Sequence, residues 1–157
     1  MLQQRTSRRK YATFLLVFTL LFFLRVLGQM LVVFADVEFL PAMEHWYSGL
    51  MPYPLLLPVQ LIMLVVMWRL VSDVKQGTGT FSGQSARVGI FLRRFSYVYF
   101  LAMVIRYILT MAYNPELRWF GHSIPVIFHM VLALFLYTYS RYLTDSTIGS
   151  TVENTGR

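Results

Sequence analysis

Four long apolar stretches decide what this chain can fold into. A bilayer core about 30 Å thick is crossed by about 20 helical residues, and each stretch reaches or approaches that length. The stretches cover about residues 11–34, 54–71, 95–113 and 124–143. Charged residues make up 13% of the chain, against about 25% in soluble domains, and the mean hydropathy is +0.56. The sequence therefore predicts an all-α membrane protein, an antiparallel four-helix transmembrane bundle.

We expect one transmembrane domain over residues 1–145, followed by a polar tail at residues 146–157 that is loosely held. The first connector reads FLPAMEHWYSGLMPYPLLLP. Its aromatic residues suit the headgroup interface, which predicts a short interfacial helix near Pro41–Tyr47. That helix either anchors the chain in the interface or covers the mouth of the bundle. Pro52, Pro54 and Pro58 oppose a smooth helical entry into the second span.

The basic residues predict the orientation of the chain. Of the 14 Lys and Arg residues, eleven lie before the first span, around the loop that joins the second and third spans, or after the fourth span. Because Lys and Arg concentrate on the cytoplasmic side, both termini are predicted to be cytoplasmic, in a bacterial inner membrane. The net charge of +7 is then explained by anionic lipid, and no nucleic-acid partner is expected. Residues 33–35 resemble a signal-peptide cleavage site, but Arg25 and Gln29 interrupt the apolar region, which argues for a retained span.

Polar side chains occur inside all four spans. With about 1.5 Å of rise per residue, each lies in the outer half of the bilayer, at about the same depth. The residues are Arg25 and Gln29 in the first span, Gln60 in the second, Arg106 in the third and His129 in the fourth. Because a polar group that faces lipid has no hydrogen-bond partner, these side chains are predicted to point into the bundle.

No Asp or Glu lies within any span, so the two arginines need another partner. Three partners remain open: a carboxylate of the first connector, above all Glu44; a lipid phosphate reached by snorkelling; or an anionic ligand held by the forked guanidinium groups. The predicted ligand site takes charge from Arg25 and Arg106 and hydrogen bonds from Gln29 and Gln60. His129 completes the ring. Its walls are Tyr99, Thr110 and Trp46, and Glu44 and His45 form its lid.

Redox chemistry is a weaker alternative. His45, His122 and His129 all lie on the predicted outer side, so a haem held by two histidines, or a quinone, is conceivable as the cofactor. A hydrogen-bonding role for each histidine is the simpler interpretation. The chain has no Cys and no CxxCH or HExxH motif, and no pair of buried carboxylates suggests acid–base catalysis. No catalytic residue and no metal site is predicted.

The segment LRVLG in the first span, together with Gly49 to Pro54 before the second, resembles the DoxX-like group of small bacterial membrane proteins. The phrase WYSGLMPYPLLLPVQ is also similar to uncharacterised four-span bacterial membrane proteins. The first resemblance implies a membrane subunit, in some relatives tied to quinone-linked redox chemistry. It transfers no catalytic residue. Arg106, His129 and the aromatic-rich first connector depart from the pattern of that group.

The leading functional hypothesis is a small membrane subunit or binding protein. It would hold an anionic or carbonyl-bearing amphiphile, such as a lipid headgroup, a quinone or the carboxylates of a cofactor. The first alternative is a structural accessory subunit of a larger membrane complex. The second is a haem- or quinone-linked oxidoreductase subunit. Membrane lipids and other membrane-protein subunits are the expected partners.

Overall fold

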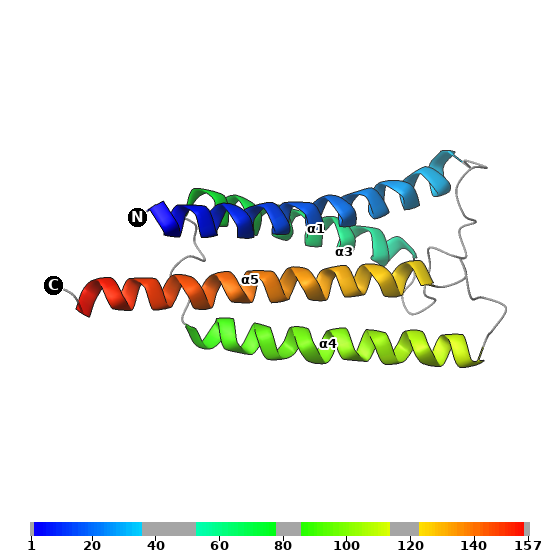
Figure 1. The fold of residues 1–157 in the computed structure, drawn as a ribbon. Helices are drawn as coiled ribbons and strands as arrows, with labels where there is room; N and C mark the ends of the chain where they lie inside the picture. The colour runs from blue at the N-terminus through cyan, green and yellow to red at the C-terminus, as the bar shows by residue number, and fades with distance from the viewer. Residues whose placement is uncertain (1, 36–52, 78–85, 114–122, 156–157) are drawn as a thin grey trace.

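The computed structural model describes residues 2–35, 53–77, 86–113 and 123–155. These residues form four helices: α1 (Leu2–Ala35), α3 (Tyr53–Gln76), α4 (Ala86–Tyr113) and α5 (Ser123–Thr155). All four are long and apolar enough to cross a membrane, so the chain is an all-helical integral membrane protein. Successive helices run in opposite directions, and the first residue of α1 lies at the same end as the last residue of α5 (Figure 1).

The helices extend beyond the predicted spans at the end that holds both termini. α1 begins at Leu2, α4 begins at Ala86 within the predicted loop, and α5 continues to Thr155 through the predicted tail. An apolar run marks the part of a helix that lipid surrounds, whereas backbone hydrogen bonds also form where the side chains are polar. Hydropathy therefore locates the crossing but not the helix end. The expected helix near Pro41–Tyr47 lies outside the described residues.

The start of α3 differs from the prediction that prolines oppose a smooth helical entry. The helix begins at Tyr53 and continues through Pro58. Proline is tolerated in a first helical turn, where the missing N–H would have no intrahelical acceptor. Pro58 lies farther in and offers no N–H to the carbonyl of Pro54. At the other end, Gly77 adopts a φ of 73° and its N–H donates to the Asp73 carbonyl at 2.8 Å, which closes the helix with a left-handed cap.

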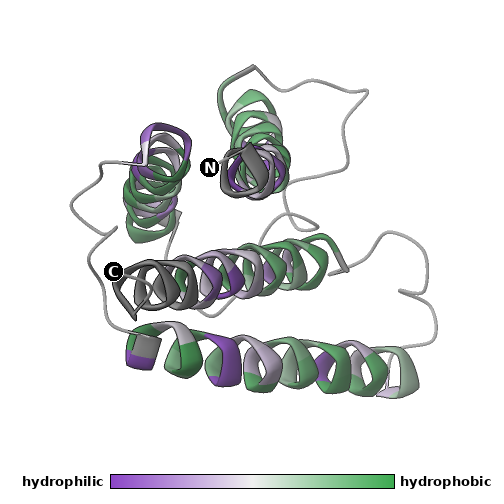
Figure 2. Cartoon of the chain, turned by 60° about the vertical axis from the view of Figure 1, so that its left-hand side comes forward, coloured by the Kyte–Doolittle hydropathy of each residue, from purple (hydrophilic) through white to green (hydrophobic). Residues whose placement is uncertain are grey.

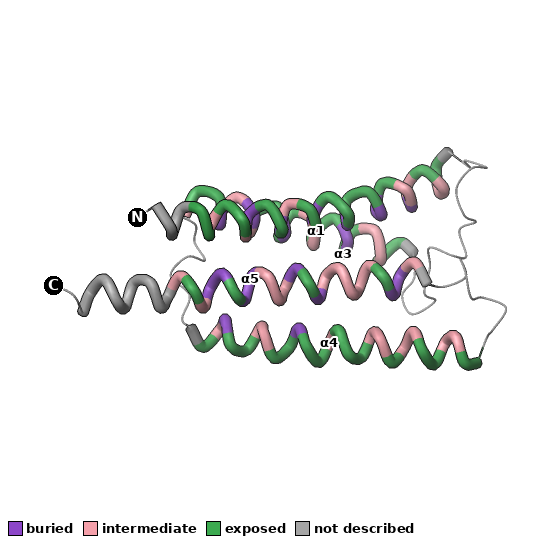
Figure 3. Tube along the Cα trace, in the orientation of Figure 1, coloured by how far each residue is buried: buried purple, intermediate pink, exposed green. Residues whose placement is uncertain are grey.

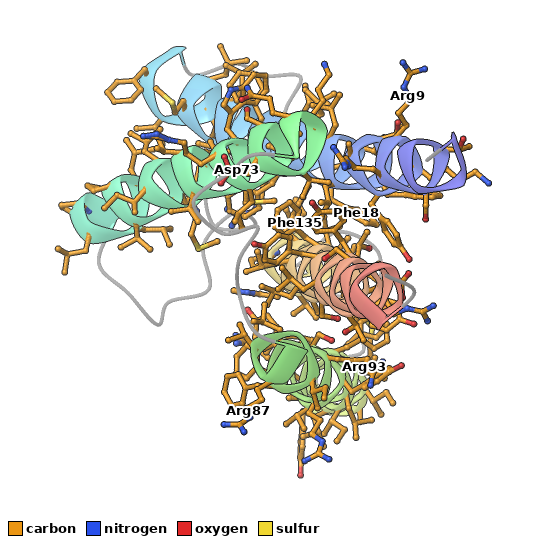
Figure 4. All side chains as sticks on the ribbon, turned by 90° about the vertical axis from the view of Figure 1, so that its left-hand side faces the viewer. Arg9, Phe18, Asp73, Arg87, Arg93 and Phe135 are labelled. Atoms are coloured by element: carbon orange, nitrogen blue, oxygen red, sulfur yellow. The ribbon has the colours of Figure 1, made fainter. Side chains whose placement is uncertain are left out.

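The helices pack in the order α3, α1, α5, α4. α1 contacts both α3 and α5, and α5 also contacts α4. Among the described residues, α3 and α4 do not touch, and Figure 4 shows α5 between α4 and the other two helices. The arrangement is therefore open. One flank of α3 and one flank of α4 have no neighbouring helix among the described residues.

The core lies where α1 meets α5 and α3. Leu15 of α1 and Phe135 and Leu143 of α5 are almost fully buried, as is Val74 of α3. Figure 3 shows buried positions on the facing sides of α1 and α5. Large apolar side chains cover the exposed sides of all four helices, and Figure 2 shows the corresponding hydrophobic ribbon surfaces. Lipid is the solvent that such surfaces require.

Near the start of α4, small residues let α4 and α5 approach closely. A Cβ added to Gly89 of α4 would lie 3.0 Å from Thr144 Oγ1 and 3.3 Å from both Leu143 Cβ and the Ser140 carbonyl of α5. Small residues let helix backbones approach closely in membranes. The Ser140 hydroxyl donates to the Tyr137 carbonyl at 2.6 Å, so it is satisfied within its own helix.

Candidate functional site

Arg25 and Gln29 lie one turn apart on α1, and both are buried. Their exposed fractions are 7% and 0%. They share the inward face of α1 with Phe22 and Val26, which are also buried. The Arg25 guanidinium lies 5.5 Å from the centroid of the Phe128 ring of α5, within the range of a cation–π contact. The predicted inward orientation of Arg25 and Gln29 is therefore confirmed.

Gln60 of α3 is also buried, at 4% exposure. Phe23 and Leu61 line the same groove between α1 and α3. With about 1.5 Å of rise per residue, Gln60 and Arg25 therefore lie within about one helical turn of the same level. Within the described part of the chain, both amide atoms of Gln29 and the Oε1 atom of Gln60 have no hydrogen-bond partner. Leaving such a group unsatisfied in an apolar interior costs about 1–3 kcal/mol.

His129 of α5 and Tyr99 of α4 form a polar contact between these two helices. The Tyr99 hydroxyl and His129 Nδ1 are 2.7 Å apart, and the two rings meet edge to face at 6.0 Å. Phe95 stacks on Tyr99 at 5.7 Å.

Arg106 and Thr110 occupy the flank of α4. They line an open groove of about 530 Å³ whose other lining residues are Ala102, Ile105, Leu109 and Tyr113. The Thr110 hydroxyl donates to the Arg106 carbonyl at 2.9 Å, so it is already satisfied within the helix. Tyr113, which helical spacing places on the same face of α4 as Tyr99, is 80% exposed. Among the described residues α4 packs only on α5, so a narrow stripe of its surface is covered.

No family model, curated protein or solved structure matches this chain. Its function is therefore argued from the chemistry of the site alone.

The structure brings only some of the predicted site residues together. Tyr99 contacts His129, and Arg25 and Gln29 share the buried face of α1. Gln60 is buried on α3, whereas Arg106 and Thr110 line the groove on α4. Trp46, Glu44 and His45 lie outside the described residues, as does His122. Sequence reasoning missed Phe128, which contacts Arg25. Its position beside His129 in an apolar run carries no signal that separates an arginine partner from a lipid-facing side chain.

The site offers donors and positive charge, but the described residues place no carboxylate in it. Those residues also contain no group of three His, Cys, Asp or Glu side chains able to hold a metal ion. Guanidinium and amide N–H groups bind carbonyl, carboxylate or phosphate oxygens. The arrangement is thus suited to binding an oxygen-rich group.

Replacing Tyr99 with phenylalanine is expected to remove the hydrogen bond to His129 and leave the fold intact. Hydrogen bonds between membrane helices contribute about 0.6 kcal/mol on average, so the change in unfolding free energy should be of that size. The nitrogen NMR signals of the His129 ring should shift. Tyr113→Phe, at an exposed position of the same helix, should alter neither measurement. An unchanged His129 spectrum in Tyr99→Phe would contradict the contact.

Proposed function

We propose that this chain is a small integral membrane subunit or binding protein that holds an anionic or carbonyl-bearing amphiphile in the outer half of the bilayer. A lipid headgroup, a quinone and a cofactor carboxylate are the classes of ligand that fit. In this proposal the four helices form an antiparallel transmembrane bundle in a bacterial inner membrane, with both termini cytoplasmic. The resemblance to DoxX-like proteins is consistent with it and stays a prediction.

The buried amides carry the proposal. Gln29 is fully buried, and neither of its amide atoms is satisfied among the described residues. An apolar residue of the same size at this position would avoid that cost. A ligand oxygen bound by the Gln29 NH₂ group, beside the charge of Arg25, gives a reason for glutamine here. The ligand would enter from the outer leaflet, next to the first connector.

Gln29→Leu and Gln60→Leu test this proposal without removing a charge. If the amides serve a ligand, the variants should unfold at the same temperature as the wild type or a higher one, because an unsatisfied polar group has been removed. Mass spectrometry of solvent extracts should show one amphiphile at near-equal ratio in the wild type and at a strongly reduced ratio in the variants. Arg25→Ala should reduce it further. Gln76→Leu, at an exposed position of α3, is the matched control.

The opposite result is equally clear. If Gln29→Leu lowers the unfolding temperature by several degrees and the extracts hold only bulk membrane lipid, the amide has a structural role. The proposal would then be wrong.

A structural accessory subunit is the second candidate, and the open packing favours it. α4 exposes Val98, Leu101, Ile105 and Ile108 and touches no helix but α5 among the described residues. A partner subunit would pack on this flank. Co-purification of a second membrane protein, lost on Leu101→Trp and retained on Phe14→Trp, would support it. The haem or quinone oxidoreductase hypothesis stays a prediction, which a visible absorption band lost on His129→Ala would test.

A further inference from the structure

The groove between α1 and α3 begins at the end of these helices that holds the termini and runs as far as Phe23 and Leu61, near Arg25 and Gln60. Its upper part has a volume of about 490 Å³, and its deeper part about 670 Å³. Trp68 of α3 lines both parts, so they adjoin at this side chain. The volumes fall in the usual range for sites that hold small molecules, about 300–1,000 Å³.

The upper part of the groove is basic. Arg8 and Arg9 of α1 face Lys75 of α3 across it, and Thr13 and Ser72 add hydroxyl groups. Among the described residues, these three cations make no ion pair with a carboxylate. Figure 4 shows the Arg9 side chain on the side of α1 away from Phe135 of α5.

The surroundings of Arg8, and the position of the nearby carboxylate of Asp73, decide whether the positive charge of the groove is already neutralised. A side chain on Gly77 would collide with the Arg8 guanidinium, so Arg8 lies against the C-terminal turn of α3, where exposed carbonyls attract a cation. Asp73, the carboxylate nearest to Lys75 along α3, is not among the residues that line this groove.

The deeper part of the groove is mostly apolar. Leu20 and Phe23 of α1 and Leu61, Leu64 and Val65 of α3 line it, and Thr19 and Arg69 add two polar side chains near Trp68. Along α3, Lys75 to Trp68 covers about 10 Å and Trp68 to Leu61 about 10 Å more. Half of a bilayer core is about 15 Å deep. The basic part lies at the terminal end of α3, at headgroup level, and the apolar part is long enough for about two thirds of an acyl chain.

We propose that this groove binds one anionic phospholipid from the leaflet on the side of the termini. Its phosphate lies between Arg8, Arg9 and Lys75, and one acyl chain lies along α1 and α3 below Trp68. Charge complementarity selects an anionic over a zwitterionic headgroup, and the two helices that flank the groove give a bound lipid contacts that the surrounding bilayer does not. The deep end of the groove approaches Arg25 and Gln60, whereas its basic part lies at the opposite end of the helices from Gln29. Arg9→Gln and Lys75→Gln change only that basic part, so each proposal can fail without the other.

Native mass spectrometry of the full chain, with phosphatidylglycerol and phosphatidylcholine of identical acyl chains, tests the headgroup part. We expect the wild type to retain phosphatidylglycerol preferentially. Each basic residue near a membrane surface contributes about a fivefold gain in binding of anionic lipid. Arg9→Gln combined with Lys75→Gln should therefore lower phosphatidylglycerol binding by roughly 25-fold. Arg8 is left in place to preserve the contact with Gly77.

The matched control is Arg93→Gln with Arg94→Gln on α4, which removes the same charge at the same end of the molecule. It should leave binding almost unchanged. Equal losses in the two double variants would mean a general attraction to a basic surface and would overturn the proposal. So would equal retention of the two lipids by the wild type.

The fluorescence of Trp68 gives a second measurement, which leaves the basic residues of the groove unchanged. In a Trp46→Phe, Trp119→Phe chain, Trp68 is the remaining tryptophan of the three. Brominated phosphatidylglycerol at a tenth of the lipid should quench its fluorescence far more than brominated phosphatidylcholine at the same fraction. Equal quenching by the two lipids would contradict a bound anionic lipid at this position.

Discussion

Replacing Phe135 with alanine is expected to lower the free energy of unfolding by about 2–4 kcal/mol, within the range for large-to-small core substitutions. The Phe135 side chain is 1% exposed and lies in the core cluster where α5 meets α1. Figure 4 shows Phe135 and Phe18 between the two helices. The loss comes from packing contacts, because helices in lipid gain little from hydrophobic transfer. Thermal unfolding in mild detergent, followed by circular dichroism, measures it.

Phe14→Ala is the matched control for Phe135→Ala. Phe14 is 58% exposed on α1, where lipid or detergent fills the space left by the ring. Its unfolding temperature should stay close to that of the wild type. Equal losses at the two positions would contradict the placement of the core between α1 and α5.

Replacing Gly89 with leucine is expected to move α4 away from α5. The Cβ alone would meet three atoms of α5 at 3.0–3.3 Å, and a leucine adds three more carbons there. Overpacking of this kind costs about 1–3 kcal/mol, and the distance between helix axes should grow by about 2 Å, the spread seen between small and large interface residues. Spin labels at Arg94 and Arg141, both exposed, report that distance.

Gly89→Ala gives the graded comparison. Alanine in a helix gains up to about 1 kcal/mol over glycine from its intrinsic preference, which offsets part of the crowding. The variant should therefore lie between the wild type and Gly89→Leu in both distance and stability. If Gly89→Leu leaves the label distance and the unfolding temperature unchanged, α4 and α5 do not approach closely at this residue.

Sequence reasoning located the four crossings because apolar length is set by the thickness of the bilayer. It did not give the packing order. In water, an apolar stripe reveals the buried face of a helix, but here Val98 on an exposed side and Phe135 in the core are both apolar. Lipid and protein interior select the same residue types, so periodicity does not distinguish α4, which packs on one helix, from α1, which packs on two.

The polar residues were more informative than the apolar ones. Arg25, Gln29 and Gln60 are costly in lipid, and that cost alone predicted the burial that the structure shows. The argument was weaker for α4. Arg106 is partly buried, because a long side chain at the flank of a helix can reach a polar environment without full burial. Which of these groups meet each other depends on helix rotation, which no spacing rule specifies.

The packing order also has a consequence for biosynthesis. A chain enters the membrane from its N-terminus, so α1 and α3 are in place before α5 has been made. The Phe128 ring that lies over Arg25 belongs to α5, as does Asp145, which accepts the Tyr11 hydroxyl hydrogen bond at 2.5 Å. The contacts of α1 with α5 join residues more than 100 positions apart. During synthesis, Arg25 therefore enters the bilayer before α5 has been inserted. A chain truncated before Ser123 lacks Phe128, whose ring contacts the Arg25 guanidinium.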